Sequence, residues 1–291
     1  MIKILVTGGT GQLASCIAEA SLNHIRNMKF VYRSSAELDI TNLKAVSKEF
    51  ETGNYDFCIN CAAYTNVDAA ETNPSFADAV NRMGARNLAN ISSEKNTILI
   101  HISTDFVFDG SNSLPYSEED EPYGLGVYGN TKLLGEKEIA SACKKHFIIR
   151  TSWLYSEYGH NFMKSMLKYG KEMDKLSIVY DQIGTPTYAK DLADVILLLI
   201  EKNIKSYGTY HYSNEGVASW YDFAKAIFEI NKITVSVNPI RTDEYPSPAK
   251  RPSYSVLDKT KIKDLLGIQI PYWRNSLLRA SEVYQKNNLV T

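Results

Sequence analysis

A glycine-rich segment near the start of the chain constrains the fold more than any other feature. Thr7-Gly8-Gly9-Thr10-Gly11-Gln12-Leu13-Ala14 follows a short β-branched run, residues 2–7, and precedes a segment with helical spacing. Gly8 permits a tight turn, Gly11 lets the backbone approach a pyrophosphate, and Ala14 lets the helix pack closely on a sheet. The N-terminus of that helix offers unpaired N–H groups and a positive dipole to phosphates. The sequence therefore predicts a nucleotide-binding loop whose cofactor contacts are Gly8, Thr10, Gly11, Gln12 and Leu13.

Strand-like and helical patterns alternate through the first half of the chain. Strands are predicted at residues 2–7, 30–32, 57–62, 97–102 and 147–153, and helices at 12–26, 43–50, 74–93 and 127–142. Such alternation is typical of βαβ units, so we expect an α/β fold of Rossmann type with a doubly wound parallel sheet.

The regular alternation of strand and helix patterns becomes less clear after Trp153, and most of the prolines lie in this part of the chain. A helix at 189–201, a strand at 209–212, a helix that opens at Ser219 and two C-terminal helices are still visible. Ser219 and Asp222 have the spacing of a capping box. We interpret residues 1–153 as a nucleotide-binding domain and 154–291 mainly as a smaller substrate lobe, from which single segments can return to the sheet.

Composition excludes several classes of function. The formal net charge is −1 and no basic stripe is visible, which argues against nucleic acid as a partner. No apolar run is long enough to cross a bilayer, and the N-terminus lacks the pattern of a signal peptide, so we expect a cytoplasmic protein. Cys58 and Cys61 form a CxxC pair that a metal or redox site could use. With no second pair and no nearby histidine, we interpret the cysteines as reduced thiols and expect no metal.

A tyrosine and a lysine lie four residues apart in a predicted helix. Tyr128 and Lys132 therefore share one helix face. A neighbouring ammonium favours the phenolate and lowers the pKa of a tyrosine, giving a general acid that can protonate a developing alkoxide. Ser103 and Thr104 end a predicted parallel strand, at the edge where such sheets bind ligands. A hydroxyl there can hydrogen-bond the substrate oxygen, so Ser103 or Thr104 together with Tyr128 and Lys132 are the predicted catalytic groups.

The end of the second predicted strand bears on cofactor choice. A site specific for NAD would place an acid there to hold the ribose hydroxyls, but residues 31–35 contain none and the first acid is Glu37. Arg33 and the two serines beside it suit a 2′-phosphate, although Arg33 can also be a solvated strand end. NADPH is the predicted cofactor, with NADH left open.

At this point the chain resembles the extended short-chain dehydrogenase/reductases, and within them the dTDP-4-dehydrorhamnose reductase family. The resemblance covers nearly the whole length. It rests on ordered segments at residues 6–13, 38–41, 60–68, 103–110, 128–132, 150–155, 181–187 and 251–252. The resemblance implies hydride transfer from NAD(P)H to C4 of a dTDP-4-keto-6-deoxy-L-sugar, giving dTDP-L-rhamnose.

The same resemblance assigns roles to individual residues. Tyr128 would donate the proton, Lys132 would bind the nicotinamide ribose, and Thr104 would hold the keto oxygen, with Ser103 on the cofactor side. The adenosine and pyrophosphate side would be lined by Asp39, Ile40, Ala62, Ala63 and Tyr64. The nucleotide sugar would meet Asp105, Trp153 and Arg251, where Trp153 as a core residue and Arg251 as a surface residue remain alternatives.

Two departures from the family pattern limit what is carried over. Some members form a magnesium-bridged homodimer through acidic residues, but the matching positions here are Ser15 and Lys190, so we expect a monomer or a homodimer without that bridge. Related dehydratases carry a glutamate where this chain has Phe106, which argues against dehydration. Two alternatives stay open: a reductase or epimerase of another nucleotide sugar, and a non-catalytic subunit resembling the regulatory subunit of methionine adenosyltransferase.

Overall fold

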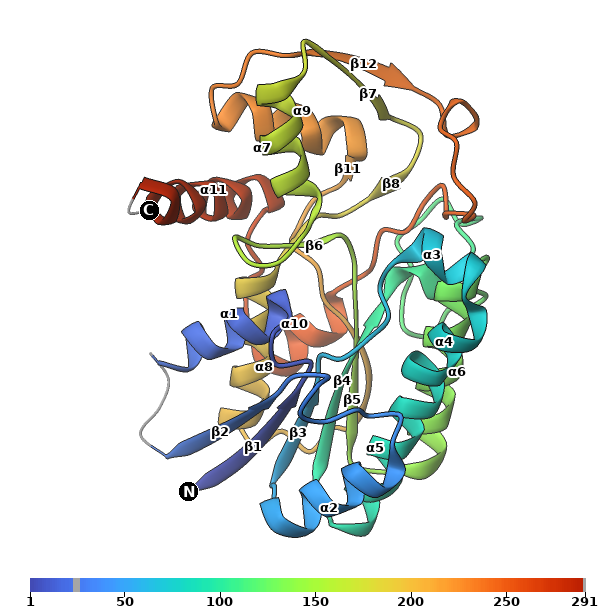
Figure 1. Ribbon diagram of the computed structural model, residues 1–291, viewed down its shortest axis with the longest axis vertical. Coiled ribbons are helices and arrows are strands. Elements are labelled where there is room, and N and C mark those ends of the chain that lie inside the picture. The colour runs from blue at the N-terminus through green and yellow to red at the C-terminus, as the bar shows by residue number, and fades with distance from the viewer. Residues whose placement is uncertain (23–26, 290–291) are drawn as a thin grey trace.

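The core of the molecule is a parallel β-sheet. The computed structural model describes residues 1–22 and 27–289, and its sheet has six strands in the order β10-β5-β4-β3-β1-β2 (Figure 1). All neighbouring strands run parallel. The inner strands are almost wholly buried, as expected for a parallel sheet covered on both faces. The strands are β1 (Ile2–Thr7), β2 (Met28–Arg33), β3 (Phe57–Asn60), β4 (Ile98–Thr104), β5 (His146–Thr151) and β10 (Gly208–His211).

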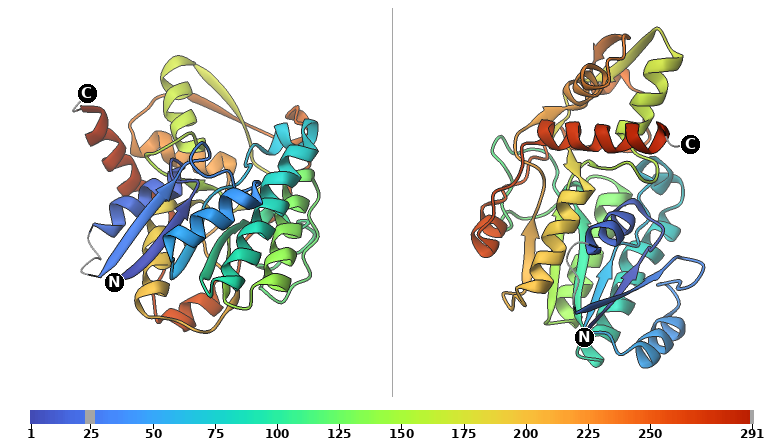
Figure 2. Two further views of the ribbon diagram at one scale, coloured as in Figure 1. Left: turned by 60° about the horizontal axis from the view of Figure 1, so that its bottom comes forward. Right: turned by 90° about the vertical axis from the view of Figure 1, so that its left-hand side faces the viewer.

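Helices cover both faces of this sheet and confirm the predicted doubly wound α/β fold (Figure 2). Apolar side chains of α1, α8 and α10 form one buried layer, and those of α2, α5 and α6 form the other. The helices are α1 (Gln12–Ser21), α2 (Leu43–Gly53), α5 (Ala85–Glu94), α6 (Val127–Ala142), α8 (Ala189–Glu201) and α10 (Thr260–Leu266). α6 and α8 have the predicted bounds, and α1 is shorter than predicted, with residues 23–26 outside the described part of the chain.

The single helix predicted over 74–93 is divided in the structure. A six-residue π-helical segment, Ala79–Gly84, separates α4 (Pro74–Asp78) from α5, and an unpredicted α3 (Val67–Thr72) comes before them. The segment turns Asn81 inward, where its amide pairs with the backbone N–H and C=O of Tyr64 at 2.9 and 3.1 Å. It also donates to the hydroxyl of Thr131 on α6 at 3.1 Å. π-Helical segments often occur at functional sites, and this one ties the loop after β3 to α6.

A second lobe lies beyond the carboxyl ends of the strands (Figure 1). It has its own apolar core, and the predicted capping box is confirmed: Ser219 Oγ accepts from Asp222 N–H at 3.0 Å and Asp222 Oδ2 accepts from Ser219 N–H at 2.9 Å. Its helices are α7 (Phe162–Glu172), α9 (Trp220–Ile230) and α11 (Trp273–Leu289). Its short strands are β6 (Leu154–Tyr155), β7 (Lys175–Val179), β8 (Ile183–Gly184), β9 (Thr187–Tyr188), β11 (Ala218–Ser219) and β12 (Ser236–Ile240).

The second half of the chain does not stay in that lobe. β10 adds the last strand beside β5, and α8 packs against α1 on one face of the sheet. The chain therefore crosses repeatedly between the sheet and the lobe, at the edge where parallel sheets bind ligands. No helix in the described residues combines the length and apolar character needed to cross a bilayer.

Candidate active site

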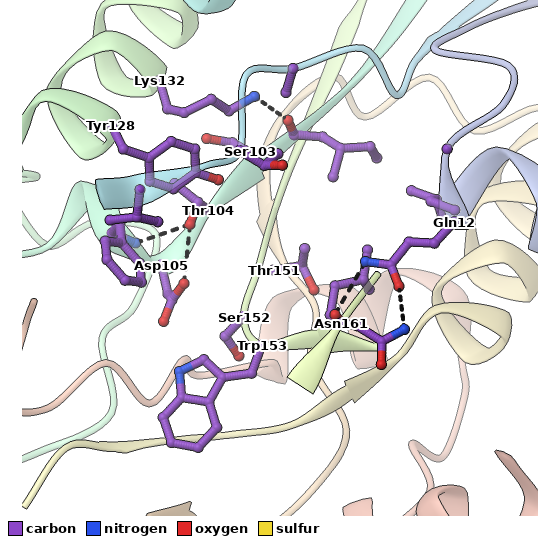
Figure 3. A pocket seen from close by; sticks show the side chains of 18 of the residues that line it. Gln12, Ser103, Thr104, Asp105, Tyr128, Lys132, Thr151, Ser152, Trp153 and Asn161 are labelled. Carbon is purple, nitrogen blue, oxygen red and sulfur yellow. Dashed lines mark hydrogen bonds between the residues drawn. The ribbon is translucent and has the colours of Figure 1, made fainter. Parts of the chain in front are cut away.

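A pocket of about 530 Å³ lies between the sheet and the second lobe. Its size is in the range of small-molecule sites, and its walls come from the carboxyl ends of β4 and β5, the start of α1, α6 and the second lobe (Figure 3). The structure brings most of the predicted site residues together here. Those that line it are Gly11, Gln12, Leu13, Ala63, Ser103, Thr104, Asp105, Tyr128, Lys132, Trp153 and Arg251.

The glycine loop forms the turn that the sequence predicts. Gly8 has a φ of +64°, and a Cβ at this position would lie 2.7 Å from the backbone nitrogen of Ala62. Gly11 occupies the N-cap position of α1, and among the described residues no side chain caps this helix. The helix also has no acid in its first turn. Its free N–H groups and positive dipole therefore face the pocket, which is a suitable place for a phosphate.

Gln12 connects this loop to the second lobe. Its Nε2 donates to the carbonyl of Leu154 at 3.2 Å, and its Oε1 accepts from Ser156 Oγ at 3.3 Å and from Asn161 Nδ2 at 3.4 Å. Both Gln12 and Asn161 line the pocket (Figure 3). Asn161 carries no signal in the sequence, because only the folded chain brings it to the phosphate loop.

Thr104 and Tyr128 lie side by side on one wall. Burial raises the pKa of Tyr128 to about 12, and the neighbouring Thr104 hydroxyl offsets this rise only in part. The ring of Phe106 packs edge-on against Tyr128, with centroids 5.6 Å apart. The sequence predicted that Lys132 would lower the pKa of Tyr128, but in the structure this pKa is raised. Tyr128 therefore holds its proton at neutral pH, as a general acid must.

Lys132 does not offset the effect of burial on Tyr128, because its amine is engaged elsewhere. It is buried, and its Nζ donates to the carbonyl of Ile102 at 2.6 Å and lies 3.1 Å from His101 Nε2. The amine nitrogen of Lys132 is thus engaged with β4. Burial lowers the pKa of Lys132 to about 8.

A buried ion pair supports the wall from behind. Arg150 on β5 and Glu136 on α6 are joined at 2.7 Å, with further contacts at 3.0 and 3.2 Å, and the side chains of both are only 6% exposed. Ser103 donates its hydroxyl to the same carboxylate. Ser103 therefore lines the pocket but has its hydroxyl committed to Glu136, which fixes the end of β4 against α6.

Asp105 brings an incompletely paired carboxylate to the pocket wall. It is 1% exposed; its Oδ1 accepts from Thr104 Oγ1 at 3.1 Å, while its Oδ2 has no hydrogen-bond partner among the described residues. Burial raises the pKa of Asp105 to about 6. A buried polar atom without a partner is costly, so this oxygen is available for a ligand group.

Two stacked indoles form the opposite wall. Trp153 has a φ of +46° and stacks on Trp220 of α9 with ring centroids 3.7 Å apart and planes 9° apart. Gly184 makes room for this arrangement, since a Cβ there would lie 2.7 Å from the Trp153 ring. A left-handed backbone conformation is rare for tryptophan and costs about 1–3 kcal/mol. The rest of the fold must offset this cost to hold the ring in the pocket wall.

Several pocket residues were missed from the sequence. Thr151, Ser152 and His160 line the pocket with Trp220. Thr151 Oγ1 is buried without a partner in the described structure, and Ser152 Oγ donates to Thr185 O at 2.7 Å. Thr151 ends β5 and Ser152 follows it, much as Ser103 and Thr104 end β4, so the same edge rule could have found them. His160 and Trp220 carry no local signal.

Arg33 and Arg251 both have acidic partners. Arg33, at the end of β2, lies 3.0 Å from Glu49, outside the pocket lining. Nearby, Glu37 accepts from the N–H and the hydroxyl of Ser34 at 2.8 and 2.7 Å. Arg251 reaches the pocket and pairs with Asp68 at 2.9 Å. The remaining predicted cofactor residues, which are not part of the lining, are Gly8, Thr10, Asp39, Ile40, Ala62 and Tyr64.

Comparison with known proteins finds relatives along nearly the whole chain. The family model described as "RmlD substrate binding domain" matches residues 2–286. The dTDP-4-dehydrorhamnose reductase of Aggregatibacter actinomycetemcomitans is 42% identical over 287 residues, covering 95% of this chain and 97% of that protein. The protein of the same name from Escherichia coli K12 is 35% identical, covering 96% of each.

Solved structures agree with this. A dTDP-4-dehydrorhamnose reductase from Clostridium acetobutylicum has a TM-score of 0.93 at 41% identity, covering 98% of this chain and 100% of that one. One from Bacillus anthracis in complex with NADP has a TM-score of 0.93 at 38% identity, with 97% and 100% covered. A UDP-glucose 4-epimerase from Thermus thermophilus, at 17% identity and a TM-score of 0.83, shares the fold.

Proposed function

This chain belongs to the dTDP-4-dehydrorhamnose reductase family, and from that premise we propose that it reduces the C4 ketone of dTDP-4-dehydro-6-deoxy-L-mannose to dTDP-L-rhamnose. It is an oxidoreductase with NADPH as the cofactor. The observation that carries the proposal is that Thr104, Tyr128 and Lys132 meet in the pocket into which the N-terminus of α1 opens.

The residues present fit a dinucleotide. The cradle at Gly8 has no room for a Cβ, and the free start of α1 suits a pyrophosphate. Gly8, Thr10, Gly11, Gln12 and Leu13 would hold the phosphates. Ser103, Tyr128 and Lys132 would hold the nicotinamide side, and Asp39, Ile40, Ala62, Ala63 and Tyr64 the adenosine side. Arg33 would take the 2′-phosphate in exchange for its contact with Glu49. When bound, NADPH supplies the hydride that reduces the ketone carbon.

Tyr128 is the proton donor in this proposal. Its hydroxyl keeps its proton at neutral pH because burial raises its pKa to about 12. The Thr104 hydroxyl, which donates to Asp105 Oδ1 at 3.1 Å in the free site, would turn to the keto oxygen and hold it within reach of that proton. As the oxygen gains negative charge, Tyr128 transfers its proton to it and the C4 hydroxyl forms. Phe106, packed on Tyr128, offers no base for proton abstraction from carbon.

The substrate side would use three further residues. Asp105 offers an unpaired carboxylate oxygen to a sugar hydroxyl, and Trp153 presents a flat ring held by Trp220. Arg251 would bind the diphosphate, which would compete with Asp68 for its guanidinium. We assign nucleotide binding to residues 1–153 and substrate binding mainly to 154–291.

Assembly and location follow the same proposal. Lys190 forms an ion pair with Glu19 at 2.5 Å, so a magnesium ion bridging two subunits at this position would meet a positive charge. We therefore propose a monomer or a homodimer without that bridge. The four cysteines are free thiols, as is usual for cytoplasmic proteins, and we propose that location.

The test is NADPH oxidation with enzymatically generated dTDP-4-dehydro-6-deoxy-L-mannose, with the product identified by NMR. Parallel reactions would use the UDP-linked 4-keto sugar and the D-configured epimer. Formation of dTDP-L-rhamnose from the first substrate alone supports the proposal. Turnover of another 4-keto sugar would identify a different reductase, and NADPH binding without any turnover would indicate a regulatory subunit.

A further inference from the structure

A buried chain of polar side chains lies behind Lys132. Lys132 Nζ is 3.1 Å from His101 Nε2, and the other ring nitrogen of His101, Nδ1, is 2.9 Å from Asn60 Nδ2. Asn60 Oδ1 accepts from Thr7 Oγ1 at 2.6 Å and from the backbone N–H of Ala62 at 3.1 Å. Thr7, Asn60, His101 and Lys132 are all at most 2% exposed, so water does not complete these contacts from bulk solvent.

The direction of each hydrogen bond along this chain is fixed. A backbone N–H can only donate, so the Asn60 atom that faces Ala62 must be the oxygen. The Asn60 nitrogen therefore faces His101 and donates to Nδ1. A neutral imidazole that accepts at Nδ1 carries its proton on Nε2. His101 is neutral, since burial lowers its pKa well below the usual value.

This polarity conflicts with a charged lysine. An ammonium group has three donors and no acceptor, so a charged Lys132 would face the N–H of His101 with a second donor. A neutral amine has a lone pair, which accepts from His101 Nε2–H while one of its own hydrogens is donated to the Ile102 carbonyl at 2.6 Å. Every contact in the chain is satisfied only in this form.

We propose that His101 is a positioning residue which, fixed by Asn60 as the Nε2–H tautomer, favours the neutral amine of Lys132 over the ammonium in the cofactor-free enzyme. This inference rests on the proposed function only for the name of the reaction that Lys132 serves.

The other ionisable groups around Lys132 are consistent with this state. Glu136, one turn further along α6, favours the ammonium, but its carboxylate is already paired with Arg150 at 2.7 Å. The Cys61 thiol lies beside β4 with its pKa raised to about 12 by burial, so it stays neutral. His146 acts on His101 from a distance and opposes a positive charge there. The pKa of Lys132, lowered to about 8 by burial, allows the neutral form.

Two other buried or half-buried histidines provide internal references. His146 Nδ1 lies 2.6 Å from the carbonyl of Cys143, and His211 Nδ1 lies 3.0 Å from the carbonyl of Tyr116. A carbonyl can only accept, so a neutral ring at either position carries its proton on Nδ1. His101 should therefore differ in tautomer from both.

The test uses the cofactor-free, full-length protein with ¹⁵N-labelled histidine and ¹³C-labelled lysine. Two-bond ¹H–¹⁵N spectra between about pH 9 and 10, above the expected lysine midpoint, identify each tautomer, with His101 assigned by the loss of its signals in His101→Gln. The Lys132 ε-carbon, assigned through Lys132→Met, gives the titration midpoint. We expect Nε2–H for His101, Nδ1–H for His146 and His211, and a lysine midpoint near 8.

Two variants of the same chain test the cause. In Asn60→Asp a carboxylate oxygen faces His101 and can only accept, so the ring should change to the Nδ1–H tautomer and the Lys132 midpoint should rise by about one pH unit or more. Thr7→Val removes a hydroxyl but leaves the Ala62 N–H, so the tautomer should stay as in the wild type. If Asn60→Asp does not fold, the wild-type spectra alone still show which tautomer His101 adopts and therefore test the inference.

The readout separates this inference from the proposed function, because it needs no substrate. An enzyme that makes no dTDP-L-rhamnose but shows the expected tautomer would overturn the function alone. A wild-type His101 that carries its proton on Nδ1, or is an imidazolium, overturns the inference whatever the activity. So does a Lys132 midpoint at the ordinary lysine value of about 10.4.

Discussion

Replacing Asp105 with asparagine should change how the stability of the protein depends on pH. Asp105 is 1% exposed and burial raises its pKa from the ordinary 3.8 to about 6. A pKa that is higher in the folded state means that the folded protein disfavours the ionised carboxylate. Below about pH 4 the carboxyl is protonated in both states and carries no such cost. Between about pH 4 and 6 the unfolded carboxyl ionises while the folded one keeps its proton, so the folded state loses stability across this range and bears the full cost above it.

The magnitude follows from those two pKa values. At about 1.36 kcal/mol for each pH unit, raising the pKa from 3.8 to about 6 corresponds to about 3 kcal/mol. Asparagine cannot ionise. The free energy of unfolding of Asp105→Asn should therefore rise by about 3 kcal/mol relative to that of the wild type between about pH 4 and pH 7. Any pH-independent effect of the new amide cancels from this difference.

The measurement is urea unfolding of both proteins at about pH 4, 5.5 and 7. Asp109→Asn is the matched control, because hydrogen bonds from Ser111 lower the pKa of Asp109. The wild type should therefore become more stable than Asp109→Asn as the pH rises. This is the opposite of the change expected for Asp105→Asn. An Asp105→Asn difference that stays constant from pH 4 to 7 would refute the account of a buried, unpaired carboxylate.

Three further predictions concern the frame of the site. Arg150→Met should lower the free energy of unfolding by about 3–5 kcal/mol, because it leaves the Glu136 carboxylate buried without its cation. Chemical denaturation should show most of this restored when Glu136→Met is added, and no recovery would contradict the reasoning. Gly8→Ala would place a Cβ 2.7 Å from the backbone nitrogen of Ala62. It should weaken NADPH binding by at least about tenfold, since about 1.4 kcal/mol of strain in the bound loop corresponds to a tenfold change in affinity. An unchanged affinity in a fluorescence titration would exclude this loop as the phosphate site. Arg33→Ala should raise the KM for NADPH by about tenfold or more and leave that for NADH nearly unchanged, whereas equal changes would mean that Arg33 does not hold the 2′-phosphate.

Local patterns predicted the parts of the site that depend on neighbouring residues in the chain. The glycine turn needs only a positive φ at Gly8 and a strand before it, and both can be read from the sequence. Tyr128 and Lys132 share a face because α6 is an uninterrupted helix, whose bounds Val127–Ala142 match the prediction. The strand-edge rule likewise placed Thr104 at the pocket.

Other features depend on packing between distant segments. Trp220 reaches Trp153 only because α9 of the second lobe folds over β5, and no periodicity in the chain encodes that contact. The π-helical segment that turns Asn81 inward differs from an α-helix by a slight widening that hydrophobic spacing does not record. The pKa of Tyr128 has the opposite direction from the prediction, because burial raises it. Spacing places Lys132 on the same helix face but does not determine that its amine meets the Ile102 carbonyl.

Proton donation by Tyr128 is the central claim, and Tyr128→Phe tests it most directly. NADPH oxidation should be followed with dTDP-4-dehydro-6-deoxy-L-mannose for the wild type, for Tyr128→Phe and for Tyr169→Phe, a control at an exposed position on α7. We predict that kcat falls by about 10²- to 10⁴-fold in Tyr128→Phe alone, with NADPH affinity retained. A Tyr128→Phe enzyme that keeps most of its kcat would contradict the assignment of Tyr128 as the acid.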